Sequence, residues 1–310
     1  MPVAASADRG VLILGGPTAG GKTAFAITLA ERYDAEIIGA DSRQIYRNMP
    51  IGTAAPTLAD QARVPHHLVG RLDPYERYTA ARFVTDAAAA ITDIQGRGKR
   101  VIVAGGTGFY LRALAGDVAL AEQADPAVRS RVLREAQLHP IDVLHDWLRA
   151  RDPRRAAALS AHDPYRIVRA LEIDLARAGH RDGPARAHSL PTLRAAGLPF
   201  VKLALRADMT ALAQRIAART DAMLAAGLIE EAERIGDGAV AADAVGYHDA
   251  WAYCRGWLTR DELRTLLIHA TRRYAKRQLT WFRGEPDISW IDAGDVAAAD
   301  AAVASIGWHA

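Results

Sequence analysis

The chain has 310 residues, of which 50% are hydrophobic and 24% charged, which excludes a disordered or collagen-like chain and is typical of a globular protein with one large domain and a smaller appended lobe. Its 39 Lys and Arg residues against 36 Asp and Glu residues leave a formal charge of +3, so binding of a polyanion depends on local clustering rather than on overall charge. Cys254 is the single cysteine, which excludes an intramolecular disulfide and a cysteine-rich zinc site and favours a reducing compartment.

A short apolar run stands near the start of the chain. Residues 11–14 read Val-Leu-Ile-Leu and predict a buried strand that ends at Gly15-Gly16. The run is too short for the core of a signal peptide, and no later run approaches membrane-spanning length. We therefore expect a cytoplasmic protein that does not associate with membranes.

The first hundred residues alternate between strand and helix patterns. Residues 22–32 place their apolar side chains on one helical face, and residues 36–40 and 100–104 predict two more strands. Strands that alternate with helices predict a parallel sheet, in which functional groups gather at the C-terminal ends of the strands.

The middle of the chain, from residue 116 to about 179, has a helical pattern. Asp125 and Asp163 are each followed by proline, and an N-cap residue before a first-turn proline is a typical helix start. Gly179 is the expected end of the helix that follows Asp163, and residues 179–199 predict a loop because they show no sustained periodicity.

The C-terminal part begins with a predicted strand over residues 200–205. Residues 208–283 are mostly helical in pattern, with breaks expected near residues 236–238, 246 and 256. No internal repeat is visible.

The most informative segment is residues 16–23, which match the P-loop pattern G-x-x-x-x-G-K-[ST] between a predicted strand and a predicted helix. Backbone N–H groups of such a loop form an anion-binding nest, and the next helix directs its positive dipole end to the same place. Lys22 would neutralise phosphate charge, and the Thr23 hydroxyl would help to hold Mg²⁺. The residues predicted to bind a phosphate ester are Gly16, Pro17, Thr18, Ala19, Gly20, Gly21, Lys22 and Thr23.

Polar residues follow the other two predicted strands of the N-terminal part. Asp41 either caps the next turn or lies beside the phosphate site as a general base or metal ligand. The cluster at 105–108, Gly-Gly-Thr-Gly, is explained equally well by turn chemistry and by ligand contact. His66-His67 has no further ligand at zinc spacing, so we predict no metal site there.

Basic residues cluster near the C-terminus. The stretch between residues 266 and 284 contains Arg272, Arg273, Lys276, Arg277 and Arg283 and no acidic residue. Helical spacing places several of these on one side, and aromatic residues lie between them. Arg166 and Arg169 form a second basic pair on the helix after Asp163. Two basic surfaces and one phosphate-ester site predict a polyanionic second substrate, such as nucleic acid.

Seven segments extend this pattern along nearly the whole chain. They are GPTAGGKT at 16–23, DSRQIYRNMPIGTA at 41–54, VPHHL at 64–68, GGTGFYLRAL at 105–114, RIVRALE at 166–172, AVGYHDAWAY at 244–253 and TRRYAKRQLTWFR at 271–283. Together they resemble the tRNA dimethylallyltransferases, also called tRNA isopentenyltransferases.

The resemblance implies a Mg²⁺-dependent transfer of a dimethylallyl group from dimethylallyl diphosphate to N6 of an adenine. That adenine lies at tRNA position 37, on the 3′ side of the anticodon, in tRNAs that read codons beginning with U. The implied α/β fold has a P-loop NTPase-like core, a parallel sheet flanked by helices, formed by residues 1–116 and 199–310. A smaller helical insertion over residues 117–198 carries a segment that contacts the tRNA anticodon stem-loop. We expect the protein to act as a monomer.

The resemblance also implies roles for individual residues. Asp41 matches the family's proposed base, Thr23 a hydroxyl near the diphosphate and the metal, and Arg215 an arginine that closes on the diphosphate. Residues 43, 55, 165 and 243 depart from the family's common pattern. The residues implied to bind tRNA are Asp41, Ser42, Arg43, Gln44, Thr107, Tyr165, Arg166, Arg169, Asp243, Gly246, Tyr247, Arg272, Arg273, Lys276, Arg277 and Gln278.

Two alternatives also fit the P-loop. A small-molecule or nucleotide kinase would consume ATP without RNA and gives no role to the C-terminal basic segment. A non-catalytic RNA-binding P-loop protein would tolerate Asp41→Asn with little loss of output.

Overall fold

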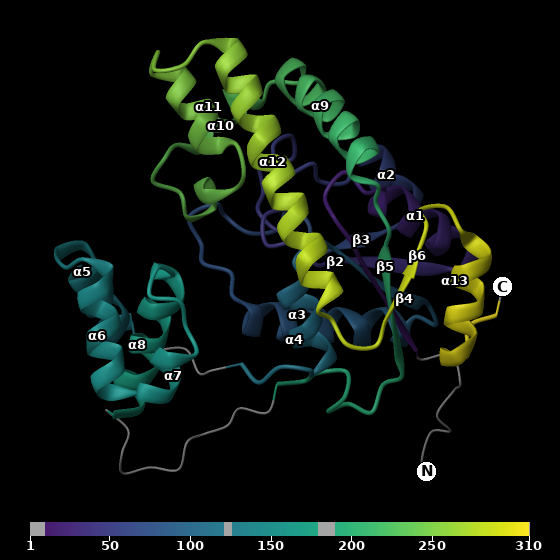
Figure 1. Ribbon diagram of the computed structural model, residues 1–310. Coiled ribbons are helices and arrows are strands. Elements are labelled where there is room, and N and C mark those ends of the chain that lie inside the picture. The colour runs from purple at the N-terminus through teal and green to yellow at the C-terminus, as the bar shows by residue number, and fades with distance from the viewer. Residues whose placement is uncertain (1–9, 121–125, 179–189, 310) are drawn as a thin grey trace. The chain divides into compact units, whose positions relative to one another are not determined.

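The computed structural model describes residues 10–120, 126–178 and 190–309 (Figure 1). The chain divides into two compact units. Unit 1 comprises Met1–Val118 and Leu190–Ala310, and unit 2 comprises Ala119–Ser189. The chain therefore leaves unit 1 once, forms unit 2, and returns.

Unit 1 contains a parallel sheet of six strands in the order β3-β2-β4-β1-β5-β6. The four predicted strands are confirmed, and the predicted α/β class with a parallel sheet flanked by helices is confirmed with them. The two strands at the sheet edges were not predicted, because they are short and gain their hydrogen bonds from a neighbouring strand. The strands are β1 (Val11–Gly15), β2 (Ala35–Gly39), β3 (His66–His67), β4 (Arg100–Ala104), β5 (Phe200–Leu205) and β6 (Ile288–Ile291).

The helices of unit 1 follow the expected pattern of breaks in the C-terminal part, near residues 236–238, 246 and 256. A further break lies at Gly227, whose φ of 100° is accessible to glycine without strain. The helices are α1 (Lys22–Tyr33), α2 (Leu58–Arg63), α3 (Ala80–Gly96), α4 (Gly108–Ala115), α9 (Met209–Ala225), α10 (Leu228–Ile235), η1 (Val240–Asp243), α11 (Tyr247–Cys254), α12 (Arg260–Arg283), α13 (Val296–Val303) and η2 (Ala304–Ile306).

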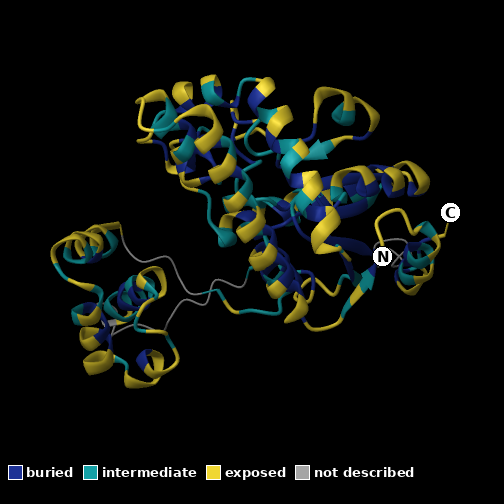
Figure 2. Cartoon of the chain, turned by 45° about the horizontal axis from the view of Figure 1, so that its top comes forward, coloured by how far each residue is buried: buried dark blue, intermediate teal, exposed yellow. Residues whose placement is uncertain are grey.

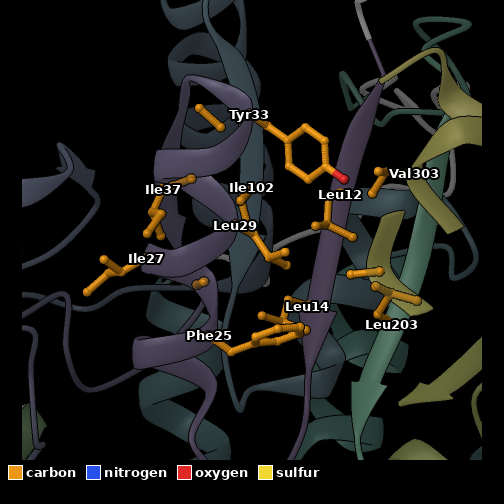
Figure 3. Packing of buried hydrophobic residues seen from close by; sticks show 14 of the residues in the cluster. Leu12, Leu14, Phe25, Ile27, Leu29, Tyr33, Ile37, Ile102, Leu203 and Val303 are labelled. Carbon is orange, nitrogen blue, oxygen red and sulfur yellow. The ribbon is translucent and has the colours of Figure 1, made fainter. Parts of the chain in front are cut away.

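The main core lies between the sheet and α1 (Figure 3). Successive strand side chains point to opposite faces, so Leu12 and Leu14 of β1 share the face that α1 covers. Phe25, Leu29 and Tyr33 of α1 pack onto them, and α13 extends the same layer. α3 and α4 contact β1, β2 and β4, and cover the opposite face. A sheet covered on both sides explains why its central strands are apolar throughout.

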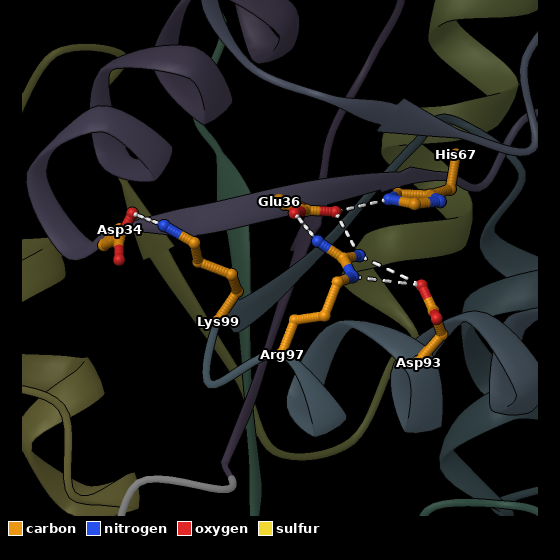
Figure 4. A network of polar contacts seen from close by, with 6 residues as sticks. All are labelled: Asp34, Glu36, His67, Asp93, Arg97 and Lys99. Carbon is orange, nitrogen blue, oxygen red and sulfur yellow. Dashed lines mark hydrogen bonds and ion pairs between the residues drawn. The ribbon is translucent and has the colours of Figure 1, made fainter.

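A polar network holds the edge of the sheet near β3 (Figure 4). Glu36 of β2 is 5% exposed and pairs with Arg97, which follows α3, through Nη2 and Oε2 at 2.8 Å. Its Oε2 also contacts His67 Nε2 at 2.6 Å. The hydrogen bonds from Arg97 lower the pKa of Glu36 to about 2, although burial works in the other direction. His67 is thus engaged with a buried carboxylate within the fold.

In its described residues, 126–178, unit 2 comprises four helices with their own small core (Figure 2). Leu148, Ile167 and Leu171 are buried there. The predicted helix start at Asp163 is confirmed, because its Oδ1 accepts a hydrogen bond from Arg166 N at 3.1 Å. Asp125, Gly179 and the 179–189 part of the loop predicted over 179–199 lie outside the described residues, and residues 190–199 form neither helix nor strand, as predicted. The helices are α5 (Pro126–Leu138), α6 (Ile141–Arg151), α7 (Pro153–Ala157) and α8 (Pro164–Ala178).

None of the helices in the described residues combines the length and the apolar composition that a membrane crossing requires.

Candidate active site

The predicted phosphate loop joins β1 to α1. Ala19 and Gly21 have φ angles of 58° and 91°, which place both in the left-handed region. Gly20 N donates to Pro17 O at 3.1 Å, and a Cβ at Gly20 would lie 2.8 Å from that same oxygen. Left-handed residues in close succession curl a backbone into the nest that binds anions. Gly21 is the N-cap of α1, so the positive end of this helix faces the loop.

Lys22 is the cation of the loop. Its Nζ donates to Pro17 O at 2.7 Å, and burial lowers the pKa of Lys22 to about 8. The Asp41 carboxylate works against this shift, whereas the nearby Arg219 adds to it. A phosphate group bound in the loop would provide a negatively charged partner for this ammonium and favour its protonated form.

Asp41 stands two residues after β2, at the same edge of the sheet. Its Oδ1 accepts hydrogen bonds from Arg43 N at 2.9 Å and from Gln44 N at 3.4 Å, so one oxygen caps the turn. Among the described residues, Oδ2 accepts no hydrogen bond and lies 3.8 Å from the position of a Cβ at Gly106. The two interpretations of Asp41 are therefore compatible, because one oxygen shapes the turn while the other is available to a ligand.

The glycine cluster after β4 brings two turns together. A Cβ at Gly105 would lie 2.0 Å from Ala40 O, so no larger residue fits beside the end of β2. Thr107 Oγ1 accepts a hydrogen bond from Ser42 N at 3.1 Å. The cluster thus fixes the turn that contains Asp41, and Thr107 acts on that turn.

Gln278 of α12 connects the phosphate loop to this second turn. Its Oε1 accepts from Thr18 N at 2.8 Å, and its Nε2 donates to Gly106 O at 2.9 Å. Only 6% of Gln278 is exposed. Both ends of the amide are therefore engaged within the protein, while Gln278 also lines the cavity, and its contact with RNA stays a prediction.

Gly246 and Tyr247, also predicted to bind tRNA, are likewise engaged within the fold, and their contact with RNA stays a prediction. Both are buried, and a Cβ at Gly246 would lie 2.4 Å from Leu267 Cδ2. Tyr247 Oη donates to Glu231 Oε1 at 2.7 Å, and the Glu231 carboxylate also accepts from the backbone N–H groups of Ile51 and Gly52. These residues contact the 49–54 loop through its backbone, so they position a segment that lines the cavity and do not line it themselves.

Arg215, which the resemblance implies closes on the diphosphate, does not line the cavity in this structure. It is exposed, whereas Arg219 of the same helix lines the cavity and donates from Nη1 to Thr18 Oγ1 at 3.3 Å. Burial lowers the pKa of Arg219, with a contribution from the charge of Arg215. Four residues exceed one helical turn by about 40°, which rotates Arg219 closer than Arg215 to the buried stripe of α9. The arginine that faces the phosphate loop is therefore Arg219.

These features surround one cavity of about 540 Å³. α9 and α12 lie side by side and contact each other (Figure 1). Residues of both helices line the cavity, together with residues at the ends of β2 and β4. The predicted residues that line it are Thr18, Ala19, Gly20, Gly21, Lys22, Thr23, Asp41, Ser42, Arg43, Gln44, Asp243, Arg277 and Gln278. Those in unit 1 that do not line it are Gly16, Pro17, Thr107, Arg215, Gly246, Tyr247, Arg272, Arg273 and Lys276.

The predicted basic surfaces are exposed. Arg272, Arg273, Lys276 and Arg277 of α12 all face solvent, and none lies within ion-pair distance of a carboxylate of a described residue. In unit 2, Tyr165 is 76% exposed and the side chain of Arg166 is 65% exposed. Arg169 is less available, because its Nη1 binds the buried Glu172 at 2.8 Å.

The residues around the phosphate loop fit a magnesium ion better than a zinc ion. The described residues contain no group of three or more His, Cys, Asp or Glu side chains that could hold a metal. The Thr23 hydroxyl is exposed at the loop, and Asp41 lines the same cavity. Mg²⁺ is usually held by one or two protein oxygens, waters and substrate phosphates, so this sparse set of donors suits it.

Tyr274 was missed as a site residue. It lines the cavity, and burial raises the pKa of its hydroxyl, with the charge of Asp41 adding to the shift. Its spacing from Leu267, Thr271 and Gln278 matches one helical face, a signal present in the sequence. Glu231 gave no such signal, because its burial depends on partners about 180 residues away.

Comparison with known proteins gives one consistent result. A family model described as IPP transferase matches residues 44–285. The chain is 43% identical to tRNA dimethylallyltransferase 1 of Citrifermentans bemidjiense over 91% of this chain and 92% of that protein. It is 40% identical to the tRNA dimethylallyltransferase of Geobacter sulfurreducens, over 91% of each chain.

Two solved structures are similar over most of the chain. The tRNA isopentenylpyrophosphate transferase of Bacillus halodurans is 34% identical with a TM-score of 0.66, over 96% of this chain and 95% of that one. A eukaryotic dimethylallyltransferase acting on tRNA is 26% identical with a TM-score of 0.72, over 96% of this chain and 77% of that one. The fold is accordingly P-loop NTPase-like, and the kinase and non-catalytic alternatives are not favoured. The chain belongs to the IPP transferase family of tRNA-modifying prenyltransferases.

Proposed function

We propose that this chain transfers a dimethylallyl group from dimethylallyl diphosphate to N6 of the adenine at tRNA position 37, in tRNAs that read codons beginning with U. The observation that carries the proposal is a single cavity whose lining includes both the phosphate loop and Asp41. A donor diphosphate in the loop and an acceptor base at Asp41 would face each other across that cavity.

Asp41 acts as the base. The N6 amine of adenine is a weak nucleophile because its lone pair is delocalised into the ring. Oδ2 of Asp41 can accept a hydrogen bond from N6–H and take the proton as the new C–N bond forms. Because Oδ1 is held by the turn, the carboxylate has little freedom to rotate away from the acceptor.

The phosphate loop stabilises the leaving group. Negative charge builds on the diphosphate as its bond to the allylic carbon loosens, and the loop N–H groups, Lys22 and Arg219 are positioned to stabilise it. We assign to Arg219 the role predicted for Arg215. Mg²⁺ held by Thr23 and the diphosphate would supply further positive charge, with the other loop residues contacting the phosphate oxygens.

The tRNA binds through electrostatic contacts around the cavity mouth. The exposed arginines and lysine of α12 and the 41–44 turn contact the anticodon loop, and Tyr165, Arg166 and Arg169 of unit 2 contact the stem-loop as well. An adenine in a loop need not leave a duplex, but it must unstack to reach Asp41.

Mass analysis of tRNA nucleosides tests the proposal. The purified protein is incubated with Mg²⁺, dimethylallyl diphosphate and unmodified tRNA, and the expected product is N6-isopentenyladenosine with release of diphosphate. A control tRNA that carries guanine at position 37 should remain unmodified. Consumption of ATP in the absence of RNA, with no modified nucleoside, would support a kinase instead.

Asp41→Asn separates binding from chemistry. We expect the variant to bind the donor diphosphate with nearly the affinity of the original protein, because the amide oxygen can still cap the turn. Transfer should fall by about 10²–10⁴-fold, since the amide cannot accept the N6 proton. Single-turnover kinetics measures the rate and calorimetry the binding, and near-normal turnover would remove Asp41 from this role.

A further inference from the structure

Arg43 and Asp243 form a two-pronged ion pair at the wall of the cavity. Arg43 Nη1 lies 2.6 Å from Asp243 Oδ1, and Arg43 Nη2 donates to Asp243 Oδ2 at 2.8 Å. The residues are 200 positions apart in the chain, and both line the cavity. The pair joins the turn after β2 to η1, where 60% of the Asp243 side chain is exposed.

The chemistry of this pair resembles that of a guanidinium bound to phosphate. A planar guanidinium donates two parallel hydrogen bonds, and it accepts a carboxylate or two phosphate oxygens in the same geometry. Exposed ion pairs contribute little to stability, so a phosphate at the cavity mouth can replace the carboxylate at small cost.

The position of Arg43 indicates which phosphate of the tRNA would replace the Asp243 carboxylate. Its backbone N–H holds Oδ1 of Asp41 at 2.9 Å, and the charges of Asp41 and Arg43 both act on the pKa of Tyr274. Arg43 is thus the cavity arginine tied to the turn of the proposed base. A nucleotide whose base reached Asp41 would bring its flanking phosphate close to this guanidinium.

Asp243 differs from the other carboxylates that line the cavity. Asp41 caps its own turn, and Asp60 closes a capping box with Thr57 at the start of α2. Asp243 serves no cap that the structure describes for η1, and its carboxylate is engaged by Arg43. Its charged side chain is 60% exposed, in a cavity that Arg277 also lines.

We propose that Asp243 occupies the place of an RNA phosphate on Arg43 and competes with the tRNA for it. The inference rests on the proposed function, and it changes the role that the resemblance implies for Asp243, which then opposes RNA binding instead of contributing to it. Asp243 keeps the guanidinium oriented toward the cavity. It also weakens the binding of any anion that contacts Arg43 alone, because that anion must first displace the carboxylate. Arg43 is then a specificity-determining residue, because its guanidinium binds the phosphate only of a nucleotide whose base has reached Asp41.

The test measures tRNA affinity as a function of salt for Asp243→Asn, Arg43→Gln and the double variant. Asp243→Asn should tighten binding about three- to tenfold and make the slope of log K against log salt steeper by about one. Arg43→Gln should weaken binding by a similar factor. In the Arg43→Gln background, most of the gain from Asp243→Asn should disappear, because only the general effect of one fewer negative charge remains.

Asp237→Asn serves as the matched control. Asp237 pairs with Arg255 at 3.7 Å, and neither residue lines the cavity, so this variant changes the charge equally without freeing Arg43. It should leave tRNA affinity nearly unchanged. Urea unfolding of all variants reports whether each one folds normally.

Three results would overturn the inference. Weaker binding by both single variants would mean that the pair only ties the two segments together. A gain from Asp243→Asn that survives in full in the Arg43→Gln background, or that Asp237→Asn reproduces, would reflect net charge alone. If the original protein modified tRNA while any of these held, only the inference would fail, whereas absence of tRNA modification would remove the proposed function and the inference together.

Discussion

The protonated form of Lys22 is only weakly stabilised by the residues around it. Burial lowers the pKa of this ammonium to about 8, and the charge of the Asp41 carboxylate offsets only part of that shift. A diphosphate in the loop would favour the protonated form and raise that pKa. Affinity for the donor is therefore linked to the proton on one identified residue.

The pH dependence of donor binding follows from this linkage. Above pH 8, we expect affinity for a non-reactive thio analogue of dimethylallyl diphosphate to fall about tenfold per pH unit, because Lys22 must regain its proton to bind. Between about pH 8 and the ordinary lysine pKa of 10.5, unfolded Lys22 binds more protons than folded Lys22, so this group makes the unliganded protein more stable as pH rises.

Calorimetric titration measures the affinity, and urea unfolding measures the stability. Lys22→Arg keeps its charge throughout this range, so its affinity should not vary with pH. An equally flat profile for the original protein would show that Lys22 is not the titrating group.

The choice between Arg219 and Arg215 is also decided at the level of single residues. Arg219→Gln should reduce the rate of transfer by about 10²–10³-fold, the usual effect of removing one positioned donor from a developing charge. Arg215→Gln is the matched control, because it removes the same charge from an exposed position one turn away. Pre-steady-state kinetics at saturating substrate measures both, and a larger loss in the Arg215 variant would reverse the assignment.

Helix α12 combines three tasks in one element. It begins with a capping box between Thr259 and Glu262, which stabilises a long helix whose exposed face is mostly charged. Near its end, Phe282 packs where Gly15 leaves room, since a Cβ there would lie 2.4 Å from the ring. Between these points Gln278 reaches the phosphate loop, and the exposed basic residues lie beside it. One helix therefore carries both the proposed RNA-binding residues and the side chain that contacts the phosphate loop.

Charge reversal tests the RNA role of this helix. Arg273→Glu with Arg277→Glu should weaken tRNA binding and make the slope of log K against log salt less steep by about 1.4–1.8, since each contact contributes about 0.7–0.9. Arg260→Glu, at the other end of α12, is the control and should leave the slope nearly unchanged. Filter binding over a range of salt concentrations measures the slope, and an unaltered slope in the double variant would place the RNA elsewhere.

At the scale of the whole molecule, the return of the chain from unit 2 is held by buried charges. Lys202 of β5 is 4% exposed and binds Glu285 at 2.9 Å and also Asp117, just before the chain leaves unit 1. Asp117 in turn accepts from Arg194 Nε at 2.6 Å, just after the chain returns. Leu193 N also donates to Leu114 O at 2.8 Å. The two crossing segments are thus joined to each other and to the sheet.

Removal of the central cation should destabilise unit 1. We expect Lys202→Met to lower the free energy of unfolding by about 3 kcal/mol, because it leaves two buried carboxylates with one fewer partner each. Arg206→Met is the control: its pair with Asp292 is exposed and 3.7 Å long, so its loss should cost less than about 1 kcal/mol. Urea unfolding measures both free energies. Equal losses would show that the buried cluster contributes no more to stability than an exposed ion pair.

Local patterns predicted much of this fold. The strands at 11–14, 36–40, 100–104 and 200–205 were recognisable because buried parallel strands require short apolar runs. The edge strands β3 and β6 were not recognisable, since their conformation comes from pairing with a neighbour. The phosphate loop could be located because its geometry needs small residues at set positions, independent of the rest of the chain.

The sequence by itself determined the fold class, the phosphate loop and the candidate base, because each depends on residues close together in the chain. Only the tertiary structure decided that Gln278, Gly246 and Tyr247 are buried, that Arg219 rather than Arg215 faces the loop, and that Arg43 meets Asp243. A polar residue is buried or exposed according to partners that a pattern of near neighbours cannot contain. The direction of a helical side chain likewise depends on which face of the helix the rest of the fold covers.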